Sequence, residues 1–190
     1  MEYTYKEECL KDILELQSQN HIDVFYGDES GFSLNCVVPY CWQFPNEPVC
    51  ILPQKGKNIN VFGLLNANGQ ELMTFDVQGS ISADFVIKAI ETFITKINKP
   101  TVLVLDNAKI HHAKIVQAKI EQWQQKGLYL FYLPAYSPHL NRIERVWRHT
   151  KYLWLNPKDY ENIETLKTAL DKIWNSFGSS YQIKFSKNEI

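Results

Sequence analysis

The sequence has few of the features that mark membrane-spanning or secreted proteins. None of its 190 residues lies in an uninterrupted apolar run of the roughly 18 residues that a membrane span needs. The N-terminal stretch MEYTYKEECLKDILELQ is charged and periodic, whereas a secretory leader has an apolar centre. We therefore expect a soluble, cytoplasmic protein with no membrane partner.

The sequence also contains few cysteines and has a net charge close to zero. The four cysteines, Cys9, Cys36, Cys41 and Cys50, lack the C-x-x-C spacing of a zinc site and are too few for a disulfide scaffold, so we expect reduced thiols. Twenty Lys and Arg against 21 Asp and Glu give a net charge of -1. Because there is no overall basic field, any DNA contact must come from a local patch or from a partner domain.

The sequence does contain enough apolar residues for one compact domain, at 45% hydrophobic and 13% aromatic. Periodicity predicts an amphipathic connector helix at 5–19 and two hairpins. The first hairpin has strands at 22–26 and 32–38 with a break at 27–31, and the second has strands at 58–66 and 71–77. The elements that follow are helix 82–98, strand 101–105, helix 108–127, strand 128–133, helix 141–155 and helix 162–177. Antiparallel hairpins followed by α-β-α-β-α predict an α/β fold with a mixed sheet flanked by helices. We expect residues 1–20 to form the connector and residues 21–190 the catalytic domain.

Acidic residues follow the elements where ligands collect. In VLVLDNAKIHH (102–112) a strand that is apolar at every position runs directly into Asp106, and the carboxyl ends of strands are where open α/β sheets bind ligands. Asp28 ends the first predicted strand, and Glu144 lies in the first turn of a helix. Carboxylates gathered from separate elements repel one another unless a cation lies between them, which favours Mg²⁺ or Mn²⁺. Two such ions support phosphodiester hydrolysis or strand transfer.

Each of these acids also has a local structural interpretation. Asp28 is compatible with a turn aspartate that bonds its own backbone, and Asp106 with a helix N-cap. Glu144 follows Asn141 by three residues, as in a capping box, and precedes Arg148 by four, as in a helical ion pair. Residue spacing alone leaves these alternatives open.

Three motifs together resemble the catalytic domain of DDE transposases of the mariner superfamily, in its bacterial insertion-sequence branch. They are GDESGF, LDNAKIH and YLPAYSPHLNRIERVW, and the resemblance runs from about residue 22 to the last helix. It implies an RNase H-like fold with Asp28, Asp106 and Glu144 as catalytic, metal-binding triad. The 37 residues between Asp106 and Glu144 are in the range of the short spacing of this superfamily. Ala135 and Arg142 stand where many relatives have proline, and neither change removes a ligand.

The resemblance further implies an activity and its partners. We expect two Mg²⁺ or Mn²⁺ ions, hydrolysis of phosphodiesters at transposon ends, and transfer of the 3′ hydroxyl into target DNA at TA sites. A homodimer, or a dimer with a separately encoded DNA-binding subunit, is expected, because relatives carry N-terminal helix-turn-helix modules and this chain starts at the connector. The bacterial protein would join the nucleoid when it binds DNA. Alternatives are a truncated, non-enzymatic remnant that associates with full-length transposase, and a general RNase H-like nuclease without end specificity.

Basic residues near the motifs are candidates for the local DNA patch. They are Lys109, His111, Arg142, Arg145 and Arg148, with Lys114 and Lys151 in the same two stretches of sequence. A solvated helix face is the alternative interpretation. His111 could instead approach the metal shell. The tryptophans Trp42, Trp123, Trp147 and Trp154 are expected in the core or an interface, and Asn141 is expected to cap the helix that carries Glu144.

Overall fold

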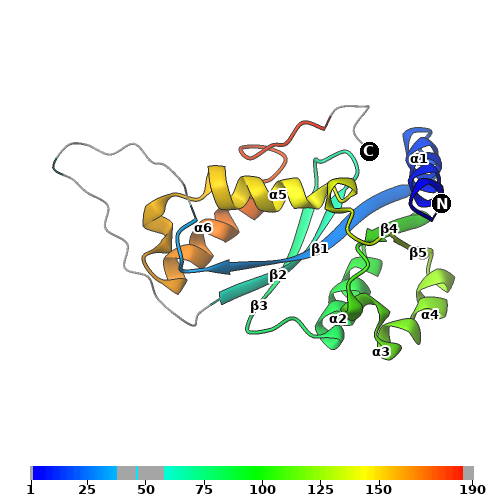
Figure 1. Ribbon diagram of the computed structural model, residues 1–190, viewed down its shortest axis with the longest axis horizontal. Coiled ribbons are helices and arrows are strands. Elements are labelled where there is room, and N and C mark those ends of the chain that lie inside the picture. Colours follow the sequence, from blue (N-terminus) through cyan, green and yellow to red (C-terminus); the bar gives the residue numbers. More distant parts are fainter. Residues whose placement is uncertain (1, 38–45, 47–57, 186–190) are drawn as a thin grey trace.

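The chain folds around one mixed sheet whose strands follow the order β3-β2-β1-β4-β5. The computed structural model describes residues 2–37, 46 and 58–185 (Figure 1). The strands are β1 (Asp23–Ser33), β2 (Asn58–Asn66), β3 (Leu72–Gln78), β4 (Thr101–Leu105) and β5 (Leu128–Tyr132). β1 pairs antiparallel with β2 and parallel with β4, β2 pairs antiparallel with β3, and β4 pairs parallel with β5. β1 therefore joins the antiparallel half of the sheet to the parallel half.

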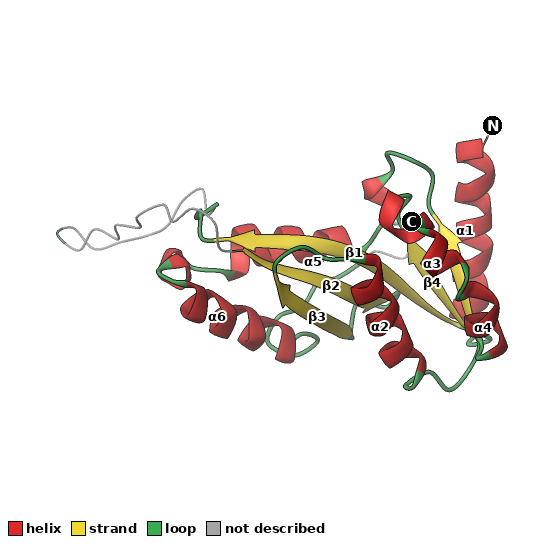
Figure 2. Ribbon diagram, turned by 90° about the horizontal axis from the view of Figure 1, so that it is seen from below, coloured by secondary structure: helices red, strands yellow, loops and turns green. Residues whose placement is uncertain are grey.

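Helices cover both faces of this sheet (Figures 1 and 2). The helices are α1 (Glu2–Ser18), α2 (Ala83–Ile94), α3 (Lys114–Gln117), α4 (Ile120–Gln125), α5 (Ile143–His149) and α6 (Ile163–Asn175), with short turns η1 (Lys109–His112), η2 (Pro138–Leu140), η3 (Thr150–Trp154) and η4 (Pro157–Tyr160). Buried residues of α1, α5 and α6 share one core with Tyr26 and Phe32 of β1. Those of α2, α3 and α4 share a second core with Leu103 and Leu105 of β4. Side chains alternate along a strand, so neighbouring residues of β1 face opposite cores.

Local sequence explains where several elements start and turn. The Ser82 side chain accepts a hydrogen bond from the backbone N–H of Phe85, which confirms the predicted N-cap of α2. The Asn162 side chain caps α6 in a capping box. In the turn between β2 and β3, Gly69 adopts a φ of 69° that an L-residue rarely adopts, and Asn66 Oδ1 accepts from the backbone N–H of Gln70. The second predicted hairpin is therefore confirmed.

The first predicted hairpin is wrong. Residues 23–33 form one continuous strand of 11 residues that pairs with β2 along most of its length. Gly27 and Gly31, which the prediction took as the break, lie inside that strand, and the second half of the proposed hairpin belongs partly to residues outside the described part of the chain. The antiparallel half of the sheet is therefore β1, β2 and β3.

Two predicted long helices are interrupted. Residues 108–127 form η1, α3 and α4, and Ala113, with a non-helical ψ of 140°, separates η1 from α3. The helix predicted at 141–155 is α5 followed by a π-helical turn at 150–154. Asn141 does not cap α5, because its side chain donates to the backbone carbonyl of Gly27 at 3.1 Å. The start of α5 is thereby joined to β1.

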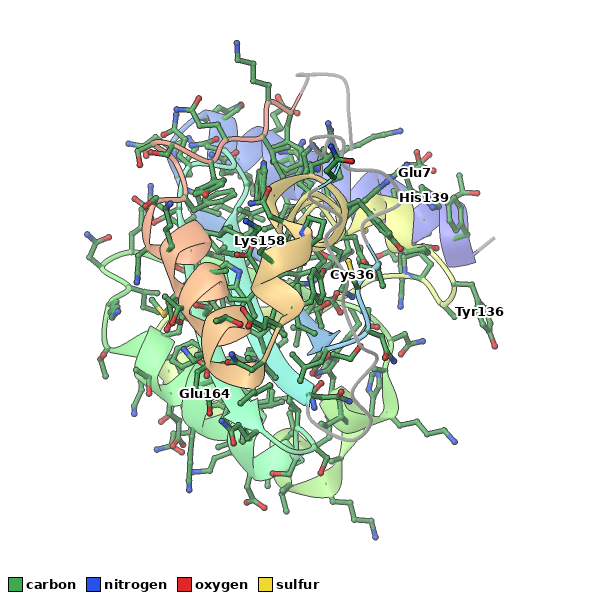
Figure 3. The ribbon with its side chains drawn as sticks, turned by 90° about the vertical axis from the view of Figure 1, so that its left-hand side faces the viewer. Glu7, Cys36, Tyr136, His139, Lys158 and Glu164 are labelled. Atoms are coloured by element: carbon green, nitrogen blue, oxygen red, sulfur yellow. The ribbon has the colours of Figure 1, made fainter. Side chains whose placement is uncertain are left out.

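The N-terminal helix packs on the domain. Leu10 is fully buried in the first core, and the hydroxyl of Tyr3 lies 2.9 Å from Nε2 of His139 in the segment before α5. Figure 3 shows His139 beside this helix, near Glu7, while Tyr136 of the same segment points away from the molecule. The helix predicted at 5–19 is confirmed; its role as a connector and the boundary at residue 20 stay predictions.

The structure bears on the predictions about membrane spans and cysteines only within the described residues. Within the described residues, no helix is long and apolar enough to cross a membrane. Cys9 and Cys36 are free thiols, while Cys41, Cys50 and Trp42 lie outside the described residues.

Candidate active site

The three predicted acids reach one region of the molecule from separate elements. Asp28 lies inside β1, and its neighbour Gly27 pairs with Leu105, the last residue of β4. Asp106 follows Leu105 directly. Glu144 lies in the first turn of α5, which packs on β1 and β2. The three carboxylates therefore lie near the carboxyl end of β4, close enough for the charges of Glu144 and Asp106 to raise the pKa of Asp28. Among the described residues, however, the group whose ligand atoms all lie within 4.8 Å of one another contains Asp106 but neither Asp28 nor Glu144.

Asp28 is the most buried of the three acids. Its side chain is only 7% exposed, and Oδ2 accepts a hydrogen bond from Nε1 of Trp147 at 3.1 Å. Burial raises the pKa of Asp28 to about 8, and the charge of Glu144 adds to this effect. Glu29 and Asp106 raise this pKa further. Burial is thus the main cause of the raised pKa, and the three neighbouring carboxylates add to it.

Asp106 is held in place by one backbone hydrogen bond and by an ion-pair contact with His111. Its Oδ1 accepts from the backbone N–H of Ala108 at 3.0 Å and lies 3.3 Å from Nε2 of His111. The contact with His111 lowers the pKa of Asp106, against the effect of burial, and Ala108 lowers it as well. The side chain thus bonds to nearby backbone, as in the N-cap interpretation, although Asp106 precedes η1 and Ala108 occupies the cap position. The same carboxylate also belongs to the acidic cluster.

His111 and Glu29 lie beside Asp106 and contact each other. The His111 side chain is fully buried, and its Nε2 lies 3.5 Å from Oε1 of Glu29. Burial lowers the pKa of His111, but the contacts with Asp106 and Glu29 outweigh it and raise the pKa to about 9. In the ion-free protein these contacts favour the protonated imidazole, whose charge lies between two carboxylates that would otherwise repel each other; to bind a metal ion, His111 would have to lose this proton.

These side chains also fit a divalent cation. The ligand atoms of Glu29, Asp106 and His111 all lie within 4.8 Å of one another. Oε1 of Glu29 and both ring nitrogens of His111 are buried without a well-aligned hydrogen bond in the described part of the chain. Carboxylate and imidazole groups are common ligands of Mn²⁺ and related ions, while Mg²⁺ prefers oxygen. The site can therefore hold a metal ion.

Glu144 and Lys151 lie along the same helical segment. Burial raises the pKa of Glu144, Lys151 lowers it, and Asp106 raises it. Burial lowers the pKa of the half-buried Lys151, whereas Glu144 and Asp28 raise it. The Lys151 ammonium also lies 5.3 Å from the centre of the Phe32 ring. The described residues contain no ion pair between Glu144 and Arg148, so that alternative is wrong.

The predicted basic residues differ in their surroundings. A groove of about 500 Å³ beside Glu144 is lined by Arg142, Arg145, Arg148 and Phe185. Arg142 donates to the carbonyl of Ala67 and lies over aromatic rings, so part of its role is structural. Arg145 lies 4.9 Å from the Phe185 ring, and Arg148 is exposed. Lys109 is exposed on η1. The buried His111 cannot reach a phosphate at the surface in this conformation.

Comparison with known proteins connects this geometry to a family. Residues 23–167 match the protein family described as DDE superfamily endonuclease, which is most of the chain. The chain belongs to the DDE superfamily of endonucleases. It is also 25% identical, over 128 residues, to the insertion element IS630 uncharacterized 39 kDa protein of Shigella sonnei. That match covers 66% of this chain and 36% of the relative.

Solved structures confirm the fold of this DDE endonuclease domain. The Mos1 transposase paired-end complex with the left transposon end matches with a TM-score of 0.65 at 15% identity, covering 93% of this chain and 55% of that one. The Mos1 strand transfer complex matches with a TM-score of 0.63 at 16% identity, covering 90% and 52%. This chain thus spans about half of the matched structures and about a third of the curated relative. The predicted RNase H-like fold and the predicted DDE family are both confirmed.

The sequence prediction omitted three side chains that the DDE endonuclease site contains. Glu29 was not predicted as a site residue, because the sequence predicts a turn at residues 27–31. In the continuous strand β1, Glu29 faces the opposite side of the sheet from Asp28. Trp147 was assigned to the core, which is correct, but its N–H also reaches Asp28. Lys151 was counted only as one of several basic residues, although it is half-buried near Glu144 and Asp28. Only the i+3 and i+7 spacing of Trp147 and Lys151 from Glu144 could have indicated their shared helix face.

The buried charge of His111 predicts a stability effect. His111→Ala removes the cation between Asp106 and Glu29, so we expect the free energy of unfolding at pH 7 to fall by about 3 kcal/mol. Urea denaturation without divalent ions measures this change. The matched control is His112→Ala, because His112 is exposed, and it should change stability by no more than about 0.5 kcal/mol. Equal effects of the two substitutions would contradict the bridging role.

Proposed function

We propose that this domain is the catalytic part of a DNA transposase, which hydrolyses phosphodiesters at transposon ends and joins the 3′ hydroxyl to target DNA. The observation that carries the proposal is the placement of Asp28 in β1, Asp106 directly after β4 and Glu144 at the start of α5, close enough for the charges of Glu144 and Asp106 to raise the pKa of Asp28. Three carboxylates from β1, the end of β4 and α5 thus share one region, as divalent-ion chemistry on a phosphodiester requires. The DDE family match supports this chemistry over a purely associative role.

The proposed triad is Asp28, Asp106 and Glu144, with two Mg²⁺ or Mn²⁺ ions as cofactor. When bound, such ions activate the attacking oxygen and stabilise the leaving one. In this chain Trp147 holds one oxygen of Asp28, and Ala108 and His111 hold Oδ1 of Asp106. Mos1 paired-end complexes, with TM-scores of 0.59 and 0.54, contain Mn and Mg, which supports the choice of ion.

The proposed substrate is DNA, bound along the groove beside Glu144. Arg145 and Arg148 line this groove, and Lys109 on η1 is also exposed. We propose that these cations contact phosphates, whereas Arg142 mainly supports the fold and His111 acts on the metal shell. The matched Mos1 structures are strand-transfer and paired-end complexes, which supports DNA ends as substrate. Action in the bacterial cytoplasm as a dimer, or with a DNA-binding subunit, is part of the same proposal.

The first test is Mn²⁺ binding measured by calorimetry, with and without a nicked duplex that imitates a cleaved end. We expect the wild type to bind the ion and, in a strand-transfer assay, to join the 3′ end of the nicked duplex to target DNA. Asp106→Asn should lose both activities. Asp84→Asn is the control, because Asp84 is exposed in the first turn of α2. Equal, weak Mn²⁺ binding by all three proteins would overturn the proposed triad. Cleavage of any duplex without preference for ends would favour a general nuclease.

A further inference from the structure

One contact links the acidic cluster directly to the core. Nε1 of Trp147 donates to Oδ2 of Asp28 at 3.1 Å, and both side chains are buried. An indole has a single N–H and no acceptor, so this donor has one possible direction for a given ring position. A hydrogen bond to a carboxylate is stronger than one between neutral groups. The orientation of Asp28 therefore depends on where the indole ring is held.

The ring is held by tight packing on the strand opposite Asp28. Gly63 of β2 is the cross-strand partner of Asp28. A Cβ atom at Gly63 would lie 2.5 Å from Cη2 and 2.6 Å from Cζ2 of Trp147, so the indole occupies the space where a side chain would otherwise lie. Phe32 packs edge-on against the ring, with centroids 6.2 Å apart. The glycine and the aromatic neighbour thus fix the position of the donor.

We propose that Trp147 is a positioning residue for Asp28: the Trp147 indole, seated on Gly63, holds Oδ2 so that the carboxylate meets the divalent ions in one orientation. This inference rests on the proposed metal-dependent function. Groups that orient a metal ligand typically change metal affinity by 10- to 100-fold when they are removed. The role differs from core packing, because it depends on the N–H group and not on the ring volume.

The chain offers a matched control for this distinction. Trp174 is also buried and packs edge-on against Phe32, with centroids 5.8 Å apart. Its Nε1 makes no hydrogen bond to the residues that the structure describes. Trp147→Phe and Trp174→Phe therefore remove similar amounts of the same core, but only the first removes a donor to a carboxylate.

The experiment measures Mn²⁺ affinity by calorimetry and the melting temperature of the ion-free protein. We expect Trp147→Phe to weaken Mn²⁺ binding by about tenfold, and Trp174→Phe to leave it unchanged while lowering the melting temperature to a similar extent. Replacement of Trp147 by benzothienylalanine, which keeps the ring shape but lacks the N–H, should reproduce the tenfold loss in a stable fold. Gly63→Ala, which displaces the ring, should act in the same direction.

A second measurement needs no metal. At a pH high enough to ionise Asp28, the indole N–H proton of Trp147 should resonate downfield of that of Trp174 in the ion-free protein, and Asp28→Asn should shift it upfield while the signal of Trp174 stays in place. The positioning role would be overturned by unchanged Mn²⁺ affinity in the benzothienylalanine protein. It would also be overturned if Asp28→Asn left the chemical shift of the Trp147 indole N–H unchanged. If the wild type itself bound Mn²⁺ no better than Asp106→Asn, the proposed function would fail instead, and the NMR result would still decide whether the indole orients Asp28.

Discussion

Replacing Glu144 with glutamine is expected to lower the rate of Mg²⁺-dependent DNA strand cleavage on the order of 10³-fold. Glu144 is exposed, so its substitution should leave the fold intact, while the loss of its negative charge removes a proposed ligand of the second ion. The measurement is single-turnover cleavage of a duplex that contains a transposon end. Because the amide keeps the shape of the side chain, the effect should appear in the rate of the chemical step and hardly in DNA affinity.

The control for this experiment is Glu121→Gln. Glu121 is also an exposed acid in the first turn of a helix, α4, and that helix packs in the other core. The Glu121→Gln protein should cleave the duplex at the wild-type rate. A Glu144→Gln protein that retained more than about a tenth of the wild-type rate would remove Glu144 from the triad.

Replacing Asp28 with asparagine is expected to stabilise the ion-free protein at pH 8. The pKa of Asp28 is raised from 3.8 in a free side chain to about 8 in the fold, so folding favours its protonated form. That contribution is fully present below pH 4 and is lost as the pH rises from about 4 to 8. The asparagine side chain does not ionise, so at pH 8 the variant should exceed the wild type by roughly 3 to 5 kcal/mol more than it does at pH 4.

Urea denaturation in a chelator, across this pH range, measures the difference between the two proteins. His111 has a raised pKa of about 9, so its stabilising charge is lost from pH 6.5 upward through 9, but this loss is common to both proteins. Mg²⁺ at pH 8 should stabilise the wild type and not the variant. A stability difference that stayed constant from pH 4 to pH 8 would show that Asp28 ionises normally in the fold.

The sequence predicted those parts of the fold in which local pattern and final structure agree. The second hairpin, β4 and β5 are continuous apolar or alternating runs, and their environments match that pattern. β1 was misjudged because Gly27 and Gly31 look like turn residues. A Cβ at Gly27 would lie 2.7 Å from Leu105, and one at Gly31 would lie 2.8 Å from Asn60, so these glycines allow close packing of neighbouring strands. Only the tertiary structure contains that reason.

In the candidate site, too, some residues could be predicted from local sequence and others depend on the tertiary structure. Asp106 and Glu144 could be predicted because Asp106 follows a strand and Glu144 starts a helix. Asp28 was predicted at the end of a strand, but it lies inside β1. The contribution of Glu29, His111 and Trp147 depends on which face of an element meets which neighbour. His111 lies in a 3₁₀ turn and not in the long helix that was predicted, which changes the direction of its side chain. Periodicity could not supply these directions.

The neighbouring acids of β1 have a consequence for how this gene can vary. Asp28 faces Trp147 and α5, while Glu29 faces His111 on the other side of the sheet. A residue deleted upstream in β1 would place Glu29 against the indole and Ser30 against the imidazole, whereas an inserted residue would place Gly27 and Asp28 there. Single-codon insertions and deletions between residues 23 and 28 should therefore be eliminated from a mutagenised population.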